Sequence, residues 1–215
     1  MFSQACLCYY FSGSDAQMFR KTCQYYNEVI KNTVGISCSI IPYSDSKFFV
    51  KDKKTVIIIS GHGTKEGLIL NISDKEIYKW KDLMDNLKTT IMIIDSCFSG
   101  YAQDYRNSNV DFLITSTYKE YSWNILDVDN NNDNVLVSSL AVTFRCRYDP
   151  NYICPIRSPL PFLNNNCKSL SINECQLELI IKDLSRCSIP NFDNNDYPSI
   201  GTCIINNMPC SYILN

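Results

Sequence analysis

The chain has 215 residues, 45% of them hydrophobic and 20% charged, which is enough to bury the core of a single domain. Its net charge of -2 provides no positive field to attract a phosphate backbone or an anionic membrane, so we expect no nucleic-acid or membrane partner. The first eight residues lack a signal-peptide pattern, and no apolar run approaches the roughly 20 residues of a membrane span. We therefore expect a cytoplasmic protein.

The apolar and turn residues predict alternating strands and helices. Residues 5–11 are apolar and aromatic, as in a buried strand, and turn residues 12–15 then begin a helix that ends near residue 31. Strands are expected at 55–59 and 91–94. The run Val-Ile-Ile-Ile within 55–59 is too uniformly apolar for a sheet with one solvated face, and the run at 91–94 is similar, so both of these strands should be covered on both sides. The other expected elements are a strand at 36–41, a hairpin at 67–72, a helix at 73–87, a strand at 111–116, helices at 135–145 and 171–186, and an irregular loop at 149–167.

The chain contains twelve cysteines and a single histidine. Disulfides would explain so many cysteines, but the missing signal peptide and the sufficient apolar content favour reduced cysteines that pack as small apolar side chains. No Cys-x-x-Cys pair occurs, so we expect no metal site.

Two motifs directly follow the two uniformly apolar strands. Ser-Gly-His-Gly occupies positions 60–63, and Asp-Ser-Cys-Phe-Ser-Gly occupies positions 95–100. In an open parallel sheet, chemistry takes place at the carboxyl ends of the strands. The separation of 35 positions from His62 to Cys97 suffices for one right-handed crossover, so neighbouring strands should present both loops at the same edge.

Cys97 and His62 have the residue types of a thiol nucleophile and its acid/base partner. A nearby imidazole takes the proton of the thiol, or stabilises the thiolate as imidazolium, and then protonates the leaving amine. An amide in the turn at Gly63, together with the amide of Cys97, would donate to the oxyanion of the tetrahedral intermediate. Taken alone, either residue is more often structural, whereas the pair at adjacent strand ends forms a catalytic constellation.

The two motifs resemble those of the caspase superfamily, the clan CD cysteine peptidases, and within it the metacaspases and related caspase-like peptidases. Residues 14–18 are similar to the family's Asn-Asp-Ala segment, and residues 112–116 match a strand that ends in a serine near the substrate cleft. The resemblance implies a single peptidase domain over residues 1–215, built as a three-layer α/β/α sandwich around a mainly parallel six-stranded sheet. Residues 1–148 would correspond to the large caspase subunit with the dyad, and residues 149–215 to the small subunit with a long loop.

The resemblance also implies a substrate class. It maps the catalytic dyad onto Cys97 and His62, and it places the following residues around a basic P1 side chain or the cleft: Asp15, Ser60, Asp95 and Ser116. Paired carboxylates bind arginine or lysine and repel an acidic side chain. Caspases proper carry an arginine near the end of the first strand, where this chain has tyrosine and phenylalanine at positions 9–11, so cleavage after aspartate is not expected.

Several alternatives stay open at this point. Asp15 sits where a residue caps a helix, so its role is either capping or substrate binding. Phe98 replaces the histidine that most metacaspases have after the nucleophile, and Asp104 stands where the resemblance allows one calcium ligand without identifiable companions. We expect no cofactor, with calcium as the alternative, and a monomer. The second functional hypothesis is a catalytically inactive caspase homologue that binds or competes for a partner.

Overall fold

The computed structural model describes residues 6–43, 54–72, 75–117, 119, 121–122, 124–128, 134–149, 200–205 and 208–213. The helix expected at 171–186 and the loop expected at 149–167, beyond its first residue, lie outside this part of the chain. Among the helices of the described ranges, none is long and apolar enough to cross a membrane.

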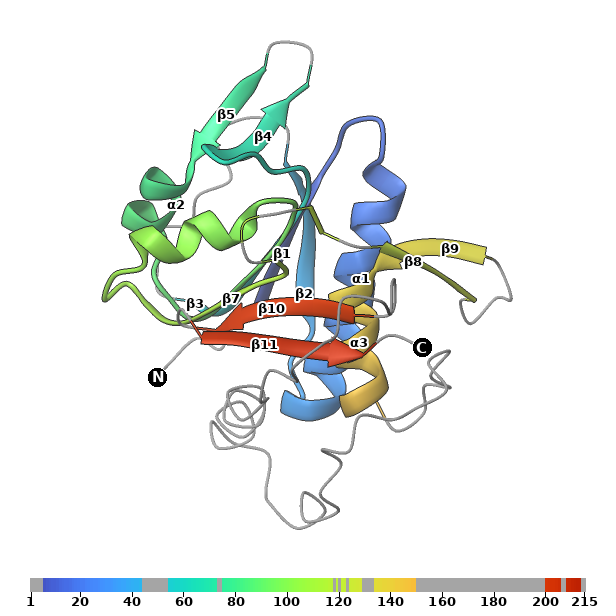
Figure 1. Ribbon diagram of the computed structural model, residues 1–215. Coiled ribbons are helices and arrows are strands. Elements are labelled where there is room, and N and C mark those ends of the chain that lie inside the picture. Colours follow the sequence, from blue (N-terminus) through green and yellow to red (C-terminus); the bar gives the residue numbers. More distant parts are fainter. Residues whose placement is uncertain are drawn as a thin grey trace.

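A seven-stranded sheet forms the centre of the molecule (Figure 1). In spatial order its strands are β11 (Met208–Ile213), β10 (Ile200–Ile205), β7 (Val110–Thr115), β6 (Thr89–Asp95), β3 (Lys54–Ser60), β1 (Cys6–Phe11) and β2 (Cys38–Tyr43). Five adjacent strands run parallel, namely β2, β1, β3, β6 and β7, while β10 pairs antiparallel with both β7 and β11. The expected mainly parallel sheet is confirmed, but it has seven strands where six were expected, because the tail folds back on itself as a hairpin.

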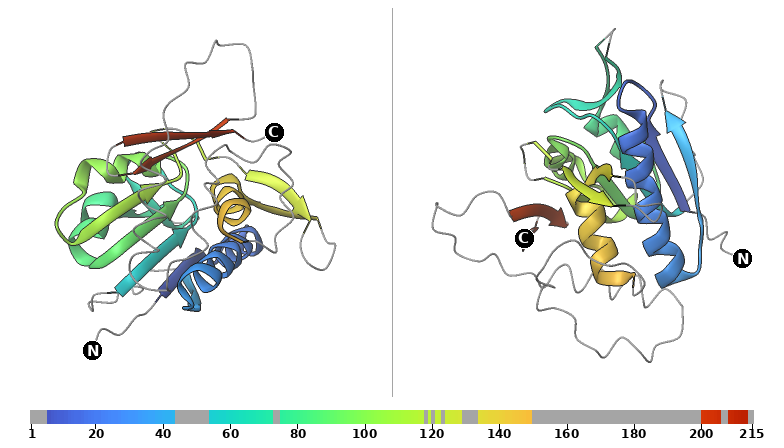
Figure 2. Two further views of the ribbon diagram at one scale, coloured as in Figure 1. Left: turned by 90° about the horizontal axis from the view of Figure 1, so that it is seen from below. Right: turned by 90° about the vertical axis from the view of Figure 1, so that its right-hand side faces the viewer.

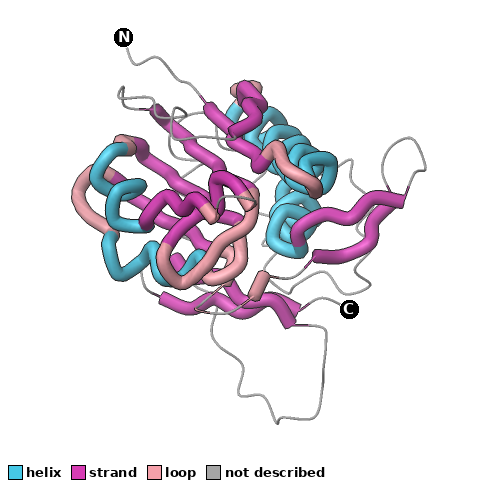
Figure 3. Tube along the Cα trace, turned by 90° about the horizontal axis from the view of Figure 1, so that it is seen from above, coloured by secondary structure: helices cyan, strands magenta, loops and turns pink. Residues whose placement is uncertain are grey.

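Helices cover both faces of this sheet (Figures 2 and 3). One face packs against α1 (Ala16–Val34) and α3 (Ser139–Tyr148), and the other packs against α2 (Trp80–Asn86) and the 3-10 helix η1 (Ser99–Tyr105). Ile58 lies in the core on the α1 side, whereas Ile57 and Ile59 lie in the core on the α2 side, and all three are completely buried. The three-layer arrangement is therefore confirmed, and it explains why β3 is a continuous apolar run.

The helix expected at 73–87 begins later than predicted. Residues Glu76–Lys79 form strand β5, which pairs antiparallel with β4 (Gly67–Asn71), and α2 begins only at Trp80. The pairing holds the buried Leu68 and Leu70 against the core under α2. Burial of this hairpin outweighs the local helix-capping signal at 73–76.

The segment before α3 also differs from the prediction. A second hairpin joins β8 (Asn124–Val128) to β9 (Asn134–Ser138), and β9 occupies the positions where the helix expected at 135–145 should begin. The helix begins at Ser139, because the Ser138 hydroxyl caps it by accepting hydrogen bonds from the amides of Leu140 and Ala141.

Two disulfides fasten β1 to its neighbours. Cys6 pairs with Cys38 across the register of β1 and β2, and Cys8 pairs with Cys23 on α1. The expectation of reduced cysteines is therefore wrong for these four. Their sequence separations of 32 and 15 residues do not reveal the pairing, because the partners meet only once the sheet and helix have assembled.

Candidate active site

The register of β3 and β6 brings the two motifs together. Ser60, the last residue of β3, lies opposite Asp95, the last residue of β6, and the amide of Gly61 donates to the carbonyl of Asp95 at 3.2 Å. His62 and Cys97 each follow two residues after this pair. Both loops therefore leave the same edge of the sheet side by side, as the strand-end rule predicts.

Gly63 allows the two loops to approach closely. A Cβ atom at this position would collide with the carbonyl oxygen of Cys97, and it would lie 2.7 Å from the Ser96 hydroxyl oxygen. The obstacle is backbone, which cannot rotate away as a flexible side chain would. Glycine is thus required here for a close approach of two backbones.

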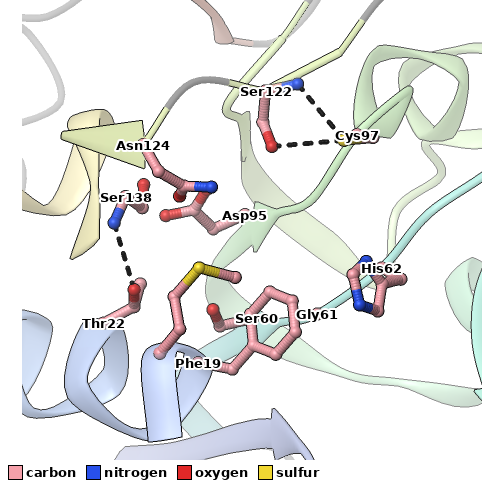
Figure 4. A pocket seen from close by; sticks show the side chains of 11 residues that line it. Phe19, Thr22, Ser60, Gly61, His62, Asp95, Cys97, Ser122, Asn124 and Ser138 are labelled. Atoms are coloured by element: carbon pink, nitrogen blue, oxygen red, sulfur yellow. Dashed lines mark hydrogen bonds between the residues drawn. The ribbon is translucent and has the colours of Figure 1, made fainter. Parts of the chain in front are cut away.

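His62 and Cys97 line one pocket (Figure 4). Its walls come from α1, from the ends of β3 and β6, and from residues around the β8–β9 hairpin. Ser60 and Asp95 are buried and also line the pocket, whereas Asp15, Gly63 and Ser116 are not among its lining residues.

The His62 ring is held by two aromatic rings and one carboxylate. The edges of Phe11 and Phe19 meet the imidazole with ring centroids 5.2 and 4.9 Å away. Its Nε2 atom lies 3.0 Å from Oδ2 of Asp15. Asp15 precedes α1 but makes no side-chain capping hydrogen bond, so its carboxylate serves the histidine rather than the helix.

The Cys97 sulfur is half-buried and lies against Ser122. The amide of Ser122 donates to it at 3.4 Å, and the hydroxyl oxygen of Ser122 lies 3.5 Å away (Figure 4). Among the described residues, no hydrogen bond joins this sulfur to His62. Sequence reasoning missed Ser122, because it lies 25 residues beyond Cys97 and outside the helices and strands that the structure describes.

Ser116 supports the loop that carries the nucleophile. Its hydroxyl accepts a hydrogen bond from the amide of Ser96 at 3.1 Å and donates to the carbonyl of the same residue at 3.1 Å. Immediately after Cys97, Phe98 adopts a left-handed backbone conformation with φ 57°, and its ring meets that of Tyr121. This conformation is uncommon for a residue with a large side chain and produces the sharp turn from β6 into η1.

Asp95 is a buried carboxylate at the base of the pocket. The Tyr26 hydroxyl donates to its Oδ2 atom at 2.7 Å, and no salt bridge of the described residues involves it. Burial raises the pKa of Asp95 above its ordinary value, and hydrogen bonds from Ser138, Tyr26 and Ser116 offset only part of this effect. A buried carboxylate of this kind gains from a cationic partner.

The raised pKa of Asp95 predicts that the free energy of unfolding depends on pH. The native state binds a proton here up to a higher pH than the unfolded chain, in which the carboxyl has its ordinary pKa of 3.8, so stability is lost as pH rises through the native pKa. Asp95→Asn cannot lose this proton, so its free energy of unfolding should rise relative to wild type from pH 4 to neutral pH. Urea unfolding across this range measures the difference. The exposed Asp82→Asn serves as control, and parallel curves for Asp95→Asn and wild type would contradict the prediction.

Comparison of the chain with family models gave no match, and comparison with curated proteins gave none. Six solved chains match its structure. One is the X-ray structure of a secreted C11 cysteine protease from Bacteroides thetaiotaomicron in complex with an irreversible peptide inhibitor. The match has a TM-score of 0.41 and 12% sequence identity, and it covers 95% of this chain and 66% of the protease. The chain spans just under two thirds of the length of the protease that it matches.

Proposed function

We propose that this chain is a cysteine endopeptidase of the caspase-like type, with Cys97 as nucleophile and His62 as acid/base partner. The observation that carries the proposal is that both side chains follow the register pair Ser60–Asp95 by two residues and line the same pocket. A thiol and an imidazole in one pocket supply the nucleophile and the proton carrier that acyl transfer needs.

In this mechanism the Cys97 thiolate attacks the peptide carbonyl carbon. His62, which has taken the thiol proton, then donates it to the departing amine, and water hydrolyses the thioester. The amides of Gly63 and Cys97 make no hydrogen bond within the described part of the chain, so both are free to donate to the oxyanion. Reaction requires the sulfur to turn from Ser122 toward His62, and such contacts commonly tighten only when substrate is bound.

We propose further that the substrate carries arginine or lysine at P1. Asp95 and Ser60 lie buried in the pocket, and the carboxylate has no cationic partner among the described side chains. A guanidinium that entered the pocket would complete an ion pair with Asp95 and lower its pKa, so binding and ionisation would favour each other. An aspartate at P1 would meet a like charge instead.

Fluorogenic peptides that differ only at P1 test this specificity. Wild-type protein should prefer Arg or Lys over Leu by on the order of 10²-fold in kcat/KM and should leave Asp peptides uncleaved. Asp95→Asn should lose most of this preference while still cleaving the Leu peptide. A variant that keeps the full preference for basic residues would rule out Asp95 as the P1 partner.

A second candidate is a catalytically inactive caspase homologue that binds or competes for a partner. The contact of the Cys97 sulfur with Ser122, and not with His62, favours it. An arginyl chloromethyl ketone distinguishes the two candidates, because it alkylates a cysteine that attacks carbonyl compounds in the pocket. Intact mass should show one adduct that Cys97→Ala lacks, and an inactive homologue would show none.

The remaining expectations concern cofactor, assembly and location. Asp104 forms a salt bridge with Lys119 at 2.8 Å, so a calcium ion would have to displace this partner. We propose a monomer that needs no cofactor, and activity unchanged by a calcium chelator would support this. The proposed cytoplasmic location conflicts with the two disulfides, since such bonds persist mainly in oxidising compartments. Fractionation of expressing cells, with thiols alkylated before lysis, decides between the two.

A further inference from the structure

We propose that Asp15 positions His62 for catalysis, so that the site works as an Asp–His–Cys arrangement and not as a simple dyad. This inference rests on the proposed peptidase function. It assigns Asp15 a positioning role in place of the substrate-binding role that the sequence resemblance implies.

The contact between the two side chains is specific in geometry. Oδ2 of Asp15 lies 3.0 Å from Nε2 of His62, although the residues are 47 positions apart. The Ser14 hydroxyl is the other hydrogen-bonding partner of this oxygen, at 3.5 Å. Because a carboxylate only accepts hydrogen bonds, it selects the tautomer that carries its proton on Nε2.

Two aromatic rings restrict the imidazole further. Phe11 ends β1 and Phe19 lies in the first turns of α1, and both meet the His62 ring edge to face at interplanar angles of 71° and 84°. With the ring held between them and Nε2 bound to Asp15, Nδ1 is the nitrogen that remains to accept the thiol proton. The carboxylate would then stabilise the imidazolium that results.

This arrangement separates the roles of the two acids. The carboxylate of Asp15 faces the histidine, and Asp15 does not line the pocket that contains Ser60 and Asp95. Loss of Asp15 should therefore reduce kcat for every peptide, whereas loss of Asp95 should change the preference among peptides. Among the described residues that line the pocket, the titratable groups besides His62 are the Cys97 thiol and the Asp95 carboxyl.

The single histidine of the chain makes a direct test possible. Protein labelled with ¹⁵N only at histidine gives one imidazole signal, which reports the tautomer of His62 without any substrate. Wild type should show the proton on Nε2. Asp15→Ala should show a mixture of tautomers, and Asp15→Asn should also lose the single wild-type tautomer, because its amide either accepts from a protonated Nε2 or donates to an unprotonated one. Asp82→Asn, which changes an exposed carboxylate outside the pocket, serves as control and should behave as wild type.

The charge of Asp15 is tested by alkylation of Cys97 with iodoacetamide, followed by mass spectrometry of the peptide that contains it. In Asp15→Asn alkylation at neutral pH should be slower than in wild type, because the imidazolium that stabilises the thiolate has lost its carboxylate. Hydrolysis of Arg and Leu peptides should fall equally, by about 10- to 100-fold in kcat with little change in KM.

Two results would overturn the inference. One is a tautomer in Asp15→Ala and an alkylation profile in Asp15→Asn that both match wild type. The other is a loss of hydrolysis confined to Arg peptides, which would return Asp15 to substrate binding. If the tautomer and alkylation respond to Asp15 but wild-type protein cleaves no peptide, the positioning role stands and the peptidase proposal fails.

Discussion

Replacing Cys97 with alanine should abolish peptide hydrolysis, with a loss on the order of 10³-fold or more in kcat, because no other group can form the thioester. The fold should survive the change. The side chain is half-buried, and among the described residues its sulfur forms hydrogen bonds with Ser122 alone. We expect the free energy of unfolding to stay within about 1 kcal/mol of wild type.

The measurement is the single-turnover hydrolysis of an Arg peptide by variants whose folding has been checked by urea unfolding. His62→Ala should fail in the same way, since the thiol then lacks its proton acceptor. Ser122→Ala is the matched control. It removes the hydroxyl beside the sulfur but retains the amide that donates to it, so its rate should stay within a few-fold of wild type. Hydrolysis that persists in Cys97→Ala would place the nucleophile elsewhere.

Gly63→Ala should have the second largest effect. The added methyl group would collide with the Cys97 carbonyl, so the histidine loop and the cysteine loop must move apart. A displacement of about 1 Å between reacting groups costs about 10²-fold in rate, and we expect a loss of that size in kcat. Overpacking should also lower the free energy of unfolding by about 1–3 kcal/mol.

Gly67→Ala separates misplacement of the site from general damage to the fold. A methyl group there would collide with the Tyr78 carbonyl in the β4–β5 hairpin, which is likewise backbone but carries no proposed catalytic residue. Its stability should fall by a similar amount, while kcat per folded molecule should remain near wild type. Equal losses of kcat in the two variants would show that the closeness of the loops at Gly63 has no special importance.

The sequence predicted the central strands of the fold because a strand that is buried on both faces is apolar at every position. The run at 56–59 is uniformly apolar, and each of its residues is completely buried. The hairpins β4–β5 and β8–β9 have a weaker sequence pattern. In β5 the polar or aromatic residues Glu76 and Tyr78 alternate with other residue types, and the strand pairs with β4 alone in the described sheet, so no uniformly apolar run marks it. The capping signal at 73–76 predicted a helix instead. Pairing with a distant segment decided their conformation.

The site was predicted where it depends on strand ends, and missed where it depends on tertiary contacts. His62 and Cys97 could be identified because both follow apolar parallel strands directly. The contact of Asp15 with His62 crosses 47 residues, and that of Ser122 with Cys97 crosses 25. Residues so far apart in the chain are not brought together by the repeat of one helix or strand, so only the assembled structure reveals these partners. The same holds for the two disulfides of β1.

The order of strands in the sheet bears on how copies of the chain can meet. Its two outermost strands are β2 and β11, and each contains a proline, Pro42 in one and Pro209 in the other. Proline has no amide proton, and within sheets it is tolerated where that side of the backbone faces solvent. A strand of another molecule that paired with β2 or β11 through the amide of the proline position would lack one hydrogen-bond donor there. Among the strands that the structure describes, the two outermost therefore each lack one amide donor.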